Sequence, residues 1–286
     1  MIIDRLFNEV EEKGMVCVGL DPNIDYIPEE LKNKYQDIDQ VIFQFNKRII
    51  DATFDIVPIY KPQIAFYEAF GLKGLTAYSR TLKYIKSLGN LTLGDVKRGD
   101  ISTTAAMYGK GHFSGDFEAD FITLNPFMGY DTIEPYLPYL REGNKGVFVL
   151  LRTSNKGAKD IQYKDSEGKK IYYHIGDNLN EMAEEFMGEC GYSSLGLVVG
   201  GTHTDEAMDI RKRYPNLYFL IPGYNAQGAS GDDVKLYLNG LNGGLVNSSR
   251  GIICAYMKEK DGYENFDYFT RKAVIDMRED IGFNKL

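Results

Sequence analysis

The segment LTLGDVKRGDI, residues 91–101, decides how this chain is expected to fold. It begins as a short apolar run and ends in a dense charged cluster that contains Asp95, Lys97 and Asp100. A strand that is buried on both faces of a parallel sheet typically reads as a continuous apolar run of this length. The segment therefore predicts a buried parallel strand whose carboxyl end carries charged side chains.

Seven further apolar runs of similar length recur along the chain. With the run at 91–96, they lie at residues 16–20, 56–60, 120–124, 147–151, 195–199, 217–221 and 244–246. Helix-length polar segments separate most of them, most clearly at residues 37–54, 73–87, 178–188 and 204–214. Strand alternating with helix eight times favours a closed parallel barrel over an open sheet. We therefore predict an α/β protein with a single (β/α)8 TIM barrel that spans residues 1–286.

Residues 156–174 do not fit this alternation. They are polar and turn-prone, with KDSEGKK at residues 164–170 in the centre. The stretch is longer than the usual connection between a strand and a helix. We expect a surface hairpin or an extended loop inserted after the fifth strand. The sequence leaves open whether it has a functional, lid-like role or is a plain surface insertion.

The composition bears on partners and location. The chain has 41 acidic and 33 basic residues and a net charge of −8, so a nucleic-acid partner, which usually needs a clustered basic surface, is not expected. The cysteines form no CxxC pair and indicate neither a disulfide framework nor a zinc site: Cys17, Cys190 and Cys254. The histidines are scattered and are expected at the surface or in loops: His112, His174 and His203. The sequence shows no signal segment and no apolar run of membrane length, so we expect a cytoplasmic protein with no membrane partner.

The charged cluster after the third strand is the sharpest chemical signal. Residues two apart on a strand point to the same face, so Asp95 and Lys97 are expected side by side. If that face is the barrel interior, the two charges must pair, because an unpaired buried charge is costly. A solvated turn of mixed charges is the alternative, and spacing alone does not decide between them.

The cluster GDVKRGDI, residues 94–101, resembles the charged array of the orotidine 5'-phosphate decarboxylase family, most closely its longer bacterial subgroup. Sugar-phosphate lyases share part of this pattern, so the resemblance depends on further matches at the other strand ends. These are VGLDP at 18–22, YKPQ at 60–63, TLNP at 123–126, RTSN at 152–155, VGGT at 199–202, PGYNAQG at 222–228 and NSSRG at 247–251. The resemblance extends from about residue 16 to residue 251.

The resemblance implies decarboxylation of orotidine 5'-monophosphate to UMP in de novo pyrimidine biosynthesis, without a metal or an organic cofactor. By this resemblance, Lys97 is the general acid that protonates C6 of the pyrimidine, and Asp95 positions it. Lys61 and Asp21 are ribose-hydroxyl contacts, and Lys61 also belongs to the charged array. The chemistry agrees, because a poorly delocalised carbanion needs a cation waiting at the reacting carbon.

The resemblance also implies a homodimer. Asp100 and Thr104 match residues that reach across to the ribose bound by the neighbouring subunit. Ser154 matches the residue that hydrogen-bonds the amide edge of the pyrimidine. An ordinary strand-end hydroxyl, satisfied by the backbone, is the alternative for Ser154.

A phosphate site is expected after the seventh and eighth strands, where barrels commonly bind phosphate through backbone N–H groups. Pro222 and Gly223 begin the first of these loops, and its stretch from 222 to 231 is the expected lid. By the resemblance, Gln227 bridges phosphate and base. Arg250 offers a planar fork of donors for a dianion, and Gly251 permits close backbone approach.

Two other functions remain open. A magnesium-dependent sugar-phosphate lyase or decarboxylase could use the same scaffold and the same charged pattern. A nucleotide-binding module without activity could keep the pocket, although binding alone does not need a buried proton donor.

Overall fold

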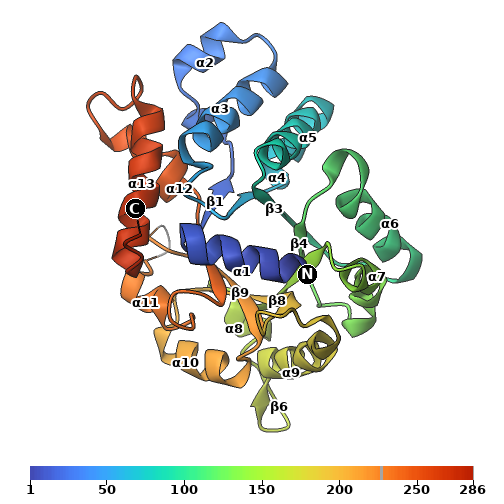
Figure 1. Ribbon diagram of the computed structural model, residues 1–286. Helices are drawn as coiled ribbons and strands as arrows, with labels where there is room; N and C mark the ends of the chain where they lie inside the picture. Colours follow the sequence, from blue (N-terminus) through green and yellow to red (C-terminus); the bar gives the residue numbers. More distant parts are fainter. Residues whose placement is uncertain (226–227, 286) are drawn as a thin grey trace.

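The computed structural model describes residues 1–225 and 228–285, and its centre is a closed barrel of eight parallel strands (Figure 1). Neighbouring strands follow one another in chain order, and the last pairs with the first. They are β1 (Val16–Leu20), β2 (Ile59–Pro62), β3 (Leu91–Arg98), β4 (Phe121–Leu124), β5 (Gly146–Arg152), β8 (Ser193–Val199), β9 (Leu217–Pro222) and β10 (Gly244–Ser248). The predicted TIM barrel is confirmed.

All eight predicted apolar runs form barrel strands, and the largest difference in position is at β2. This strand begins at Ile59, three residues after the start of the predicted run. Pro58 has no N–H to donate to a neighbouring strand, so a central strand cannot include it without losing a ladder hydrogen bond. Ile59 is the first residue of β2 that pairs with both neighbours, Cys17 and Leu91.

Helices form a ring around the barrel (Figure 1). The α-helices are α1 (Ile2–Lys13), α2 (Glu29–Lys34), α3 (Ile38–Thr53), α4 (Ala65–Glu68), α5 (Gly71–Ser87), α6 (Ser102–Phe113), α7 (Leu137–Arg141), α8 (Ala158–Ile161), α9 (Ile171–Ala183), α10 (Thr204–Arg213), α11 (Gly231–Lys235), α12 (Arg250–Ile253) and α13 (Phe266–Ile281). Helix α9 begins seven residues before the predicted segment 178–188. Its buried residues recur at helical spacing from its first turn: Tyr172, Gly176, Leu179 and Ala183.

The segment after β5 contains a hairpin. Its strands β6 (Asp165–Ser166) and β7 (Lys169–Lys170) pair in antiparallel register. Helix α8 precedes the hairpin, and α9 follows it directly, so residues 171–174 belong to the helical ring.

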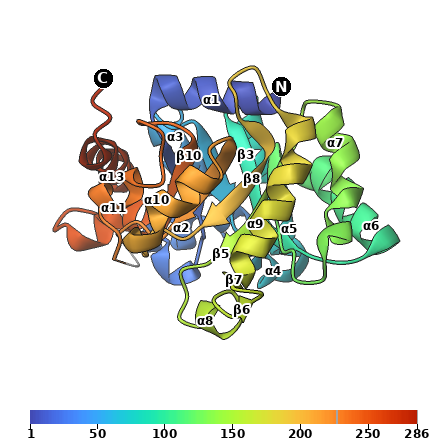
Figure 2. The ribbon, with the colours of Figure 1, turned by 90° about the horizontal axis from the view of Figure 1, so that it is seen from below.

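Helix α1 closes the amino-terminal end of the barrel. It buries Ile3, Leu6 and Val10 against the barrel core. It is also bonded to residues that precede three barrel strands: Gly143 accepts from the Ile2 N–H, Cys190 donates to Asp4, and Asn242 donates to the Phe7 carbonyl. Figure 2 shows α1 at one end of the molecule and the β6–β7 hairpin at the other. The carboxyl ends of the strands, where barrel enzymes carry their chemistry, therefore lie at the end opposite α1.

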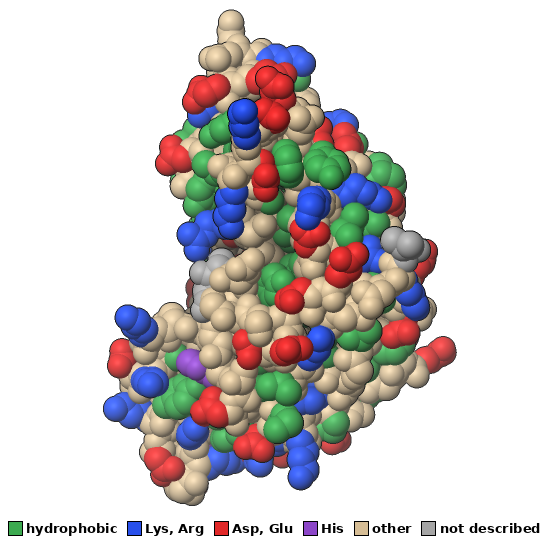
Figure 3. All heavy atoms as spheres, turned by 90° about the vertical axis from the view of Figure 1, so that its left-hand side faces the viewer, with side chains coloured by type: hydrophobic (Ala, Val, Ile, Leu, Met, Phe, Trp, Pro, Cys, Tyr) green, Lys and Arg blue, Asp and Glu red, His purple; other side chains and the backbone are tan. Residues whose placement is uncertain are grey.

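The surface carries charges of both signs. On the face shown in Figure 3, acidic and basic side chains are interspersed among polar and apolar ones. Among the helices of residues 1–225 and 228–285, none is both long enough and apolar enough to cross a membrane.

Candidate active site

A charged array lies at the carboxyl ends of β2 and β3. The Asp95 carboxylate pairs with Lys61 Nζ at 2.7 Å through Oδ2 and with Lys97 Nζ at 2.6 Å through Oδ1. The side chains of Lys61 and Asp95 are almost fully buried, whereas 45% of the Lys97 side chain is exposed. The structure therefore joins three predicted residues in one array, with the Lys97 ammonium as its accessible member.

Both buried members of the array are held in their charged forms. Burial alone would raise the pKa of Asp95, but the positive charges of Lys61 and Lys97 and their hydrogen bonds hold it well below its ordinary value. Burial alone would lower the pKa of Lys61, but the negative charges of Asp95 and Asp21 raise it above its ordinary value. At neutral pH, Asp95 is thus a carboxylate that accepts hydrogen bonds and Lys61 an ammonium that donates them.

A bulge in β3 directs Lys97 toward Asp95. The pairing of β3 with β4 shifts in register between Gly94 and Arg98, and Lys97 has a positive φ of 43°. A residue with a β-carbon rarely adopts this conformation, which is typical of bulges and functional sites. The regular strand alternation that predicted the contact with Asp95 therefore does not continue to Lys97, and the bulge brings the two side chains together instead.

Thr123, at the end of β4, stabilises this bulge. Its hydroxyl oxygen accepts from the N–H groups of Val96 at 3.0 Å and Lys97 at 2.9 Å. The hydroxyl donates to Asp95 Oδ1 at 3.0 Å. One side chain thus fixes both the backbone and the carboxylate on which the position of Lys97 depends.

Gln63 is a further contact of Asp95. Its amide nitrogen donates to Asp95 Oδ2 at 3.0 Å, and its amide oxygen accepts from the Ala65 N–H at 3.1 Å. Gln63 and Thr123 have no predicted role, although both stand in strand-end motifs. Their position at the carboxyl ends of β2 and β4 was the signal that could have identified them.

Asp21 lies beside the array at the end of β1. Gly19, two residues earlier, pairs with Lys61 on β2. Burial raises the pKa of Asp21, and the nearby positive charge of Lys61 opposes that shift. The preceding carbonyl, of Leu20, accepts a hydrogen bond from the buried Tyr67 hydroxyl, which in turn accepts one from Asn46.

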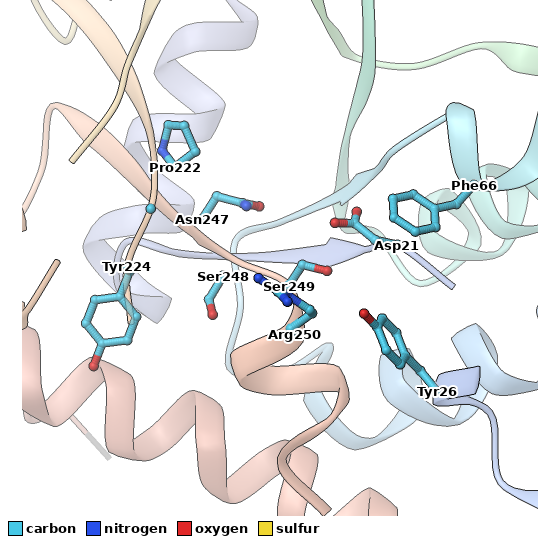
Figure 4. Close-up of a pocket in the computed structure, with 10 residues that line it drawn as sticks. Asp21, Tyr26, Phe66, Pro222, Tyr224, Asn247, Ser248, Ser249 and Arg250 are labelled. Atoms are coloured by element: carbon cyan, nitrogen blue, oxygen red, sulfur yellow. The ribbon is translucent and has the colours of Figure 1, made fainter. Parts of the chain in front are cut away.

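A pocket of about 330 Å³ opens next to Asp21, between the ends of β1, β9 and β10. It is lined by Asp21, Tyr26, Phe66, Pro222, Gly223, Tyr224, Asn247, Ser248, Ser249 and Arg250 (Figure 4). In Figure 4, Asp21, Ser249 and Arg250 point into the shared space, while the Tyr224 hydroxyl is turned away, toward Asp280 on α13.

Several features of this pocket suit an anionic ligand. Arg250 forms no ion pair with any residue that the structure describes. Ser248 Oγ is buried and finds no hydrogen-bond partner within residues 1–225 and 228–285, so its hydroxyl can donate to an anion. Gly223 has a φ of +117°, and a β-carbon at Gly251 would lie 2.7 Å from Ser248 Oγ, so both positions favour glycine. The Arg250 guanidinium therefore lies beside backbone that a ligand can approach closely, which is a suitable site for a phosphate group.

The remaining predicted residues form no hydrogen bond with the array among the residues that the structure describes. Ser154 is half-buried after β5, and Asp100 is half-buried after β3, where it accepts from the Ile101 N–H. Thr104 is exposed on α6. Gln227 lies outside the described residues.

A metal site is not formed by the described part of the chain: nowhere in residues 1–225 and 228–285 do three His, Cys, Asp or Glu side chains gather in a way that could hold an ion. One of the histidine predictions is wrong. His112 is buried on α6, where its Nε2 accepts from Arg98 Nε at 3.1 Å.

Comparison with known proteins identifies relatives over nearly the full chain. The sequence model of the orotidine 5'-phosphate decarboxylase / HUMPS family matches residues 14–262. A Petrotoga mobilis protein named orotidine 5'-phosphate decarboxylase is 63% identical over 283 residues, which cover 98% of each chain. A Clostridium acetobutylicum protein of the same name is 56% identical over 282 residues, covering 98% of this chain and 99% of that one.

A solved structure is also similar to this chain in its fold. The structure of Leishmania donovani OMP decarboxylase superposes with a TM-score of 0.76 at 29% identity, over 98% of this chain and 96% of that chain. The family match contains all eight barrel strands and therefore every strand end that contributes to the array and the pocket. The chain belongs to the orotidine 5'-phosphate decarboxylase / HUMPS family.

Proposed function

We propose that this chain decarboxylates orotidine 5'-monophosphate to UMP, a step in pyrimidine nucleotide biosynthesis. The observation that carries the proposal is the buried Lys61–Asp95 pair with the accessible Lys97 ammonium attached to it. It lies at the functional end of a barrel whose relatives over 98% of the chain are named for this reaction. A pocket suited to a phosphate opens beside it.

Lys97 is the proposed proton donor. Breaking the bond between C6 and the carboxylate releases carbon dioxide and leaves an electron pair on C6. A fixed ammonium group stabilises this developing charge because it needs no reorganisation at the moment of reaction. The ammonium then transfers one proton to C6, which forms the C–H bond of UMP, and the lysine regains a proton from solvent. Asp95, held ionised by its neighbours, aims the ammonium at that carbon.

The pocket beside Asp21 is the proposed site of the ribose and phosphate. Asp21 and Lys61 face the ribose hydroxyls, and Arg250 receives the phosphate dianion together with the backbone at Gly223 and Gly251. Binding energy from this non-reacting group would drive closure over the reacting carbon. Pro222 lines the same wall. Gln227, proposed to bridge phosphate and base, lies outside the described residues.

Ser154 is the proposed contact of the pyrimidine. It follows β5 on the rim of the barrel, and a hydroxyl there can both donate to and accept from an amide edge. A site built to hydrogen-bond one pattern of donors and acceptors discriminates strongly against the reversed pattern.

Asp100 and Thr104 are proposed to act across a homodimer interface. Neither bonds to the array of its own chain among the described residues, and both lie on an apolar part of the surface. The exposed apolar residues there are Ile101, Met107, Phe127 and Met128. Met107 lies on α6, and the segment before α6 that contains Ile101 is a neighbour of the loop after β4 that contains Phe127 and Met128, since the Asn125 N–H donates to the Arg98 carbonyl. Covering this surface with a second subunit would remove apolar area from water.

Turnover of orotidine 5'-monophosphate tests the proposal. The purified protein should convert it to UMP in the presence of EDTA. The reaction can be monitored as the loss of substrate absorbance. A magnesium-dependent lyase of the same family would lose its activity on chelation, and a binding module would bind UMP without any turnover.

Lys97→Ala tests the proposed role of the lysine. The variant should lose at least about 1000-fold in kcat, because it removes both the proton donor and the charge that stabilises the carbanion. Binding of UMP, measured by calorimetry, should persist. Lys164→Ala, which changes an exposed lysine on the hairpin segment, is the matched control. Equal rates for Lys97→Ala and the parent would remove Lys97 from the mechanism.

A further inference from the structure

The segment after β5 is attached to the residue that precedes Ser154. The amide oxygen of Gln162 accepts from the Thr153 N–H at 2.9 Å, and its amide nitrogen donates to the Thr153 hydroxyl at 2.8 Å. That hydroxyl donates onward to Asn155 Oδ1 at 2.6 Å. A single side chain from the segment therefore satisfies both the backbone and the side chain of Thr153, and we refer to this pair of hydrogen bonds as the Gln162 clamp.

A second attachment fixes the segment itself. The Tyr163 hydroxyl donates to Glu206 Oε2 at 2.6 Å, and Lys170 of β7 forms an ion pair with the same carboxylate. Glu206 lies on α10 and also faces the fully buried Arg152 at the end of β5, 3.7 Å from its Nε. Tyr163, the residue next to Gln162, is thus bonded to the helical ring. This contact helps to hold Gln162 in the position from which it bonds to Thr153.

Ser154 has little freedom on its other side. The N–H of Gly200 donates to the Arg152 carbonyl at 2.8 Å. A β-carbon at Gly200 would lie 2.8 Å from the Ser154 nitrogen and 2.9 Å from its β-carbon. The backbone of Ser154 therefore packs directly against the loop after β8, while the clamp holds the residue before it.

We propose that Gln162 is a positioning residue, through which the inserted segment fixes Ser154 in the orientation that reads the pyrimidine edge. This inference rests on the proposed function and adds a specificity role for a segment whose purpose the sequence left open. Gln162 touches no substrate in this arrangement and acts only through Thr153.

The inference predicts a selective defect. Losing the clamp frees Thr153 and, one residue later, the Ser154 hydroxyl, while the Lys61–Asp95–Lys97 array on β2 and β3 keeps its own contacts. Base recognition should therefore suffer more than proton transfer. CMP is a useful probe because the C4 amino group and N3 of cytosine reverse the donor and acceptor pattern of uracil.

Gln162→Leu removes the clamp at nearly constant size. We expect KM for orotidine 5'-monophosphate to rise about fivefold, as for the loss of a typical hydrogen bond, with kcat changed less than KM. The ratio of the CMP to the UMP inhibition constant should fall by a similar factor. Lys164→Ala, an exposed substitution in the same segment, should leave both quantities unchanged.

A double-mutant cycle with Ser154→Ala separates positioning from a general structural effect. If Gln162 acts through Ser154, the double variant should match Ser154→Ala within about twofold, because nothing remains to be positioned. Defects that multiply, or Gln162→Leu kinetics equal to those of Lys164→Ala, would overturn the inference. If Gln162→Leu does not fold, Thr153→Val removes the hydroxyl half of the clamp, and it should give a smaller defect of the same kind.

The activity of the parent protein in the same assay distinguishes a failure of the proposed function from a failure of the positioning role of Gln162. No turnover by the parent would remove the proposed function, whatever the variants do. Turnover by the parent together with unchanged recognition in Gln162→Leu, or in Thr153→Val where Gln162→Leu does not fold, would remove only the positioning role.

Discussion

Thr123 shows how one neutral side chain can set the position of a charged group. Its hydroxyl accepts from two consecutive N–H groups of the β3 bulge and donates to Asp95. Lys97 is held at a positive φ there, a conformation that persists only where the surroundings impose it. The orientation of the Lys97 ammonium, the proposed proton donor, therefore depends on a residue that takes no part in the chemistry.

Thr123→Val should weaken both catalysis and stability. We expect kcat to fall about 100-fold, since a misplacement of about 1 Å in a reacting group can cost that much. The free energy of unfolding should fall by about 1–3 kcal/mol, because the buried Val96 N–H loses its partner. Thr123→Ser keeps the hydroxyl and should retain most of the activity. Parent-like kcat in Thr123→Val would show that the bulge does not need this residue.

His112 gives the fold a pH dependence that is separate from the site. Burial and, to a smaller extent, the positive charge of Arg98 together lower the pKa of this ring from 6.5 to about 4. Between these two pH values the unfolded chain binds a proton at this position and the folded chain does not. The stabilising contribution is therefore fully present above pH 6.5 and is lost as the pH falls toward about 4.

Urea unfolding at pH 7 and pH 5 should reveal this contribution. The parent should lose about 1–2 kcal/mol more stability between the two pH values than His112→Gln does. Glutamine keeps an acceptor for Arg98 but does not titrate. Equal losses in both proteins would mean that the ring binds its proton equally well in the folded and the unfolded chain.

Helix α1 contributes to the stability of the fold at a place remote from the proposed active site. It closes the amino-terminal end of the barrel, and the charged array lies at the carboxyl end. Leu6 lies on the inner face of α1 and is completely buried. A cavity there should destabilise the fold without reaching the site.

Leu6→Ala should therefore lower the free energy of unfolding by about 2–5 kcal/mol, the usual range for this substitution in a core. Its kcat and KM should stay within about twofold of the parent at a temperature where the variant is folded. Glu12→Ala, exposed on the same helix, controls for changes at the helix surface. A fall in kcat that follows the loss of stability would show that α1 and the site are coupled.

The elements also show what a sequence can and cannot predict. Apolar runs identified all eight barrel strands, because a strand buried on both faces leaves a strong local signal. The bulge at Lys97 left no such signal, because the hydroxyl of Thr123, on another strand, helps to impose it. The burial of His112 was missed for the same reason, since it depends on how α6 packs. The strand-end motifs indicated which residues gather at the site, and only the fold shows that Gln63 and Thr123 complete it.

Whether one chain forms a complete site depends on where Asp100 and Thr104 act. Within the described residues, Asp100 and Thr104 form no hydrogen bond with the array of their own chain, and the exposed apolar residues Ile101 and Met107 are close to them in the sequence. In a symmetric dimer the same patch meets itself, so each subunit would present these two residues to its partner. The two sites of such a dimer would then be shared.

Complementation between two inactive variants tests this arrangement. Asp100→Ala and Lys97→Ala should each be nearly inactive alone. In a mixed dimer one site combines the intact Lys97 of one subunit with the intact Asp100 of the other, and the second site carries both defects. With equal mixing, half of the dimers are mixed and half of their sites are intact, so activity should return to roughly one quarter of the parent value. Subunit exchange can be verified by native mass spectrometry. If exchange occurs and activity stays at the level of the separate variants, Asp100 acts within its own chain, and the exposure of Ile101 and Met107 needs another explanation.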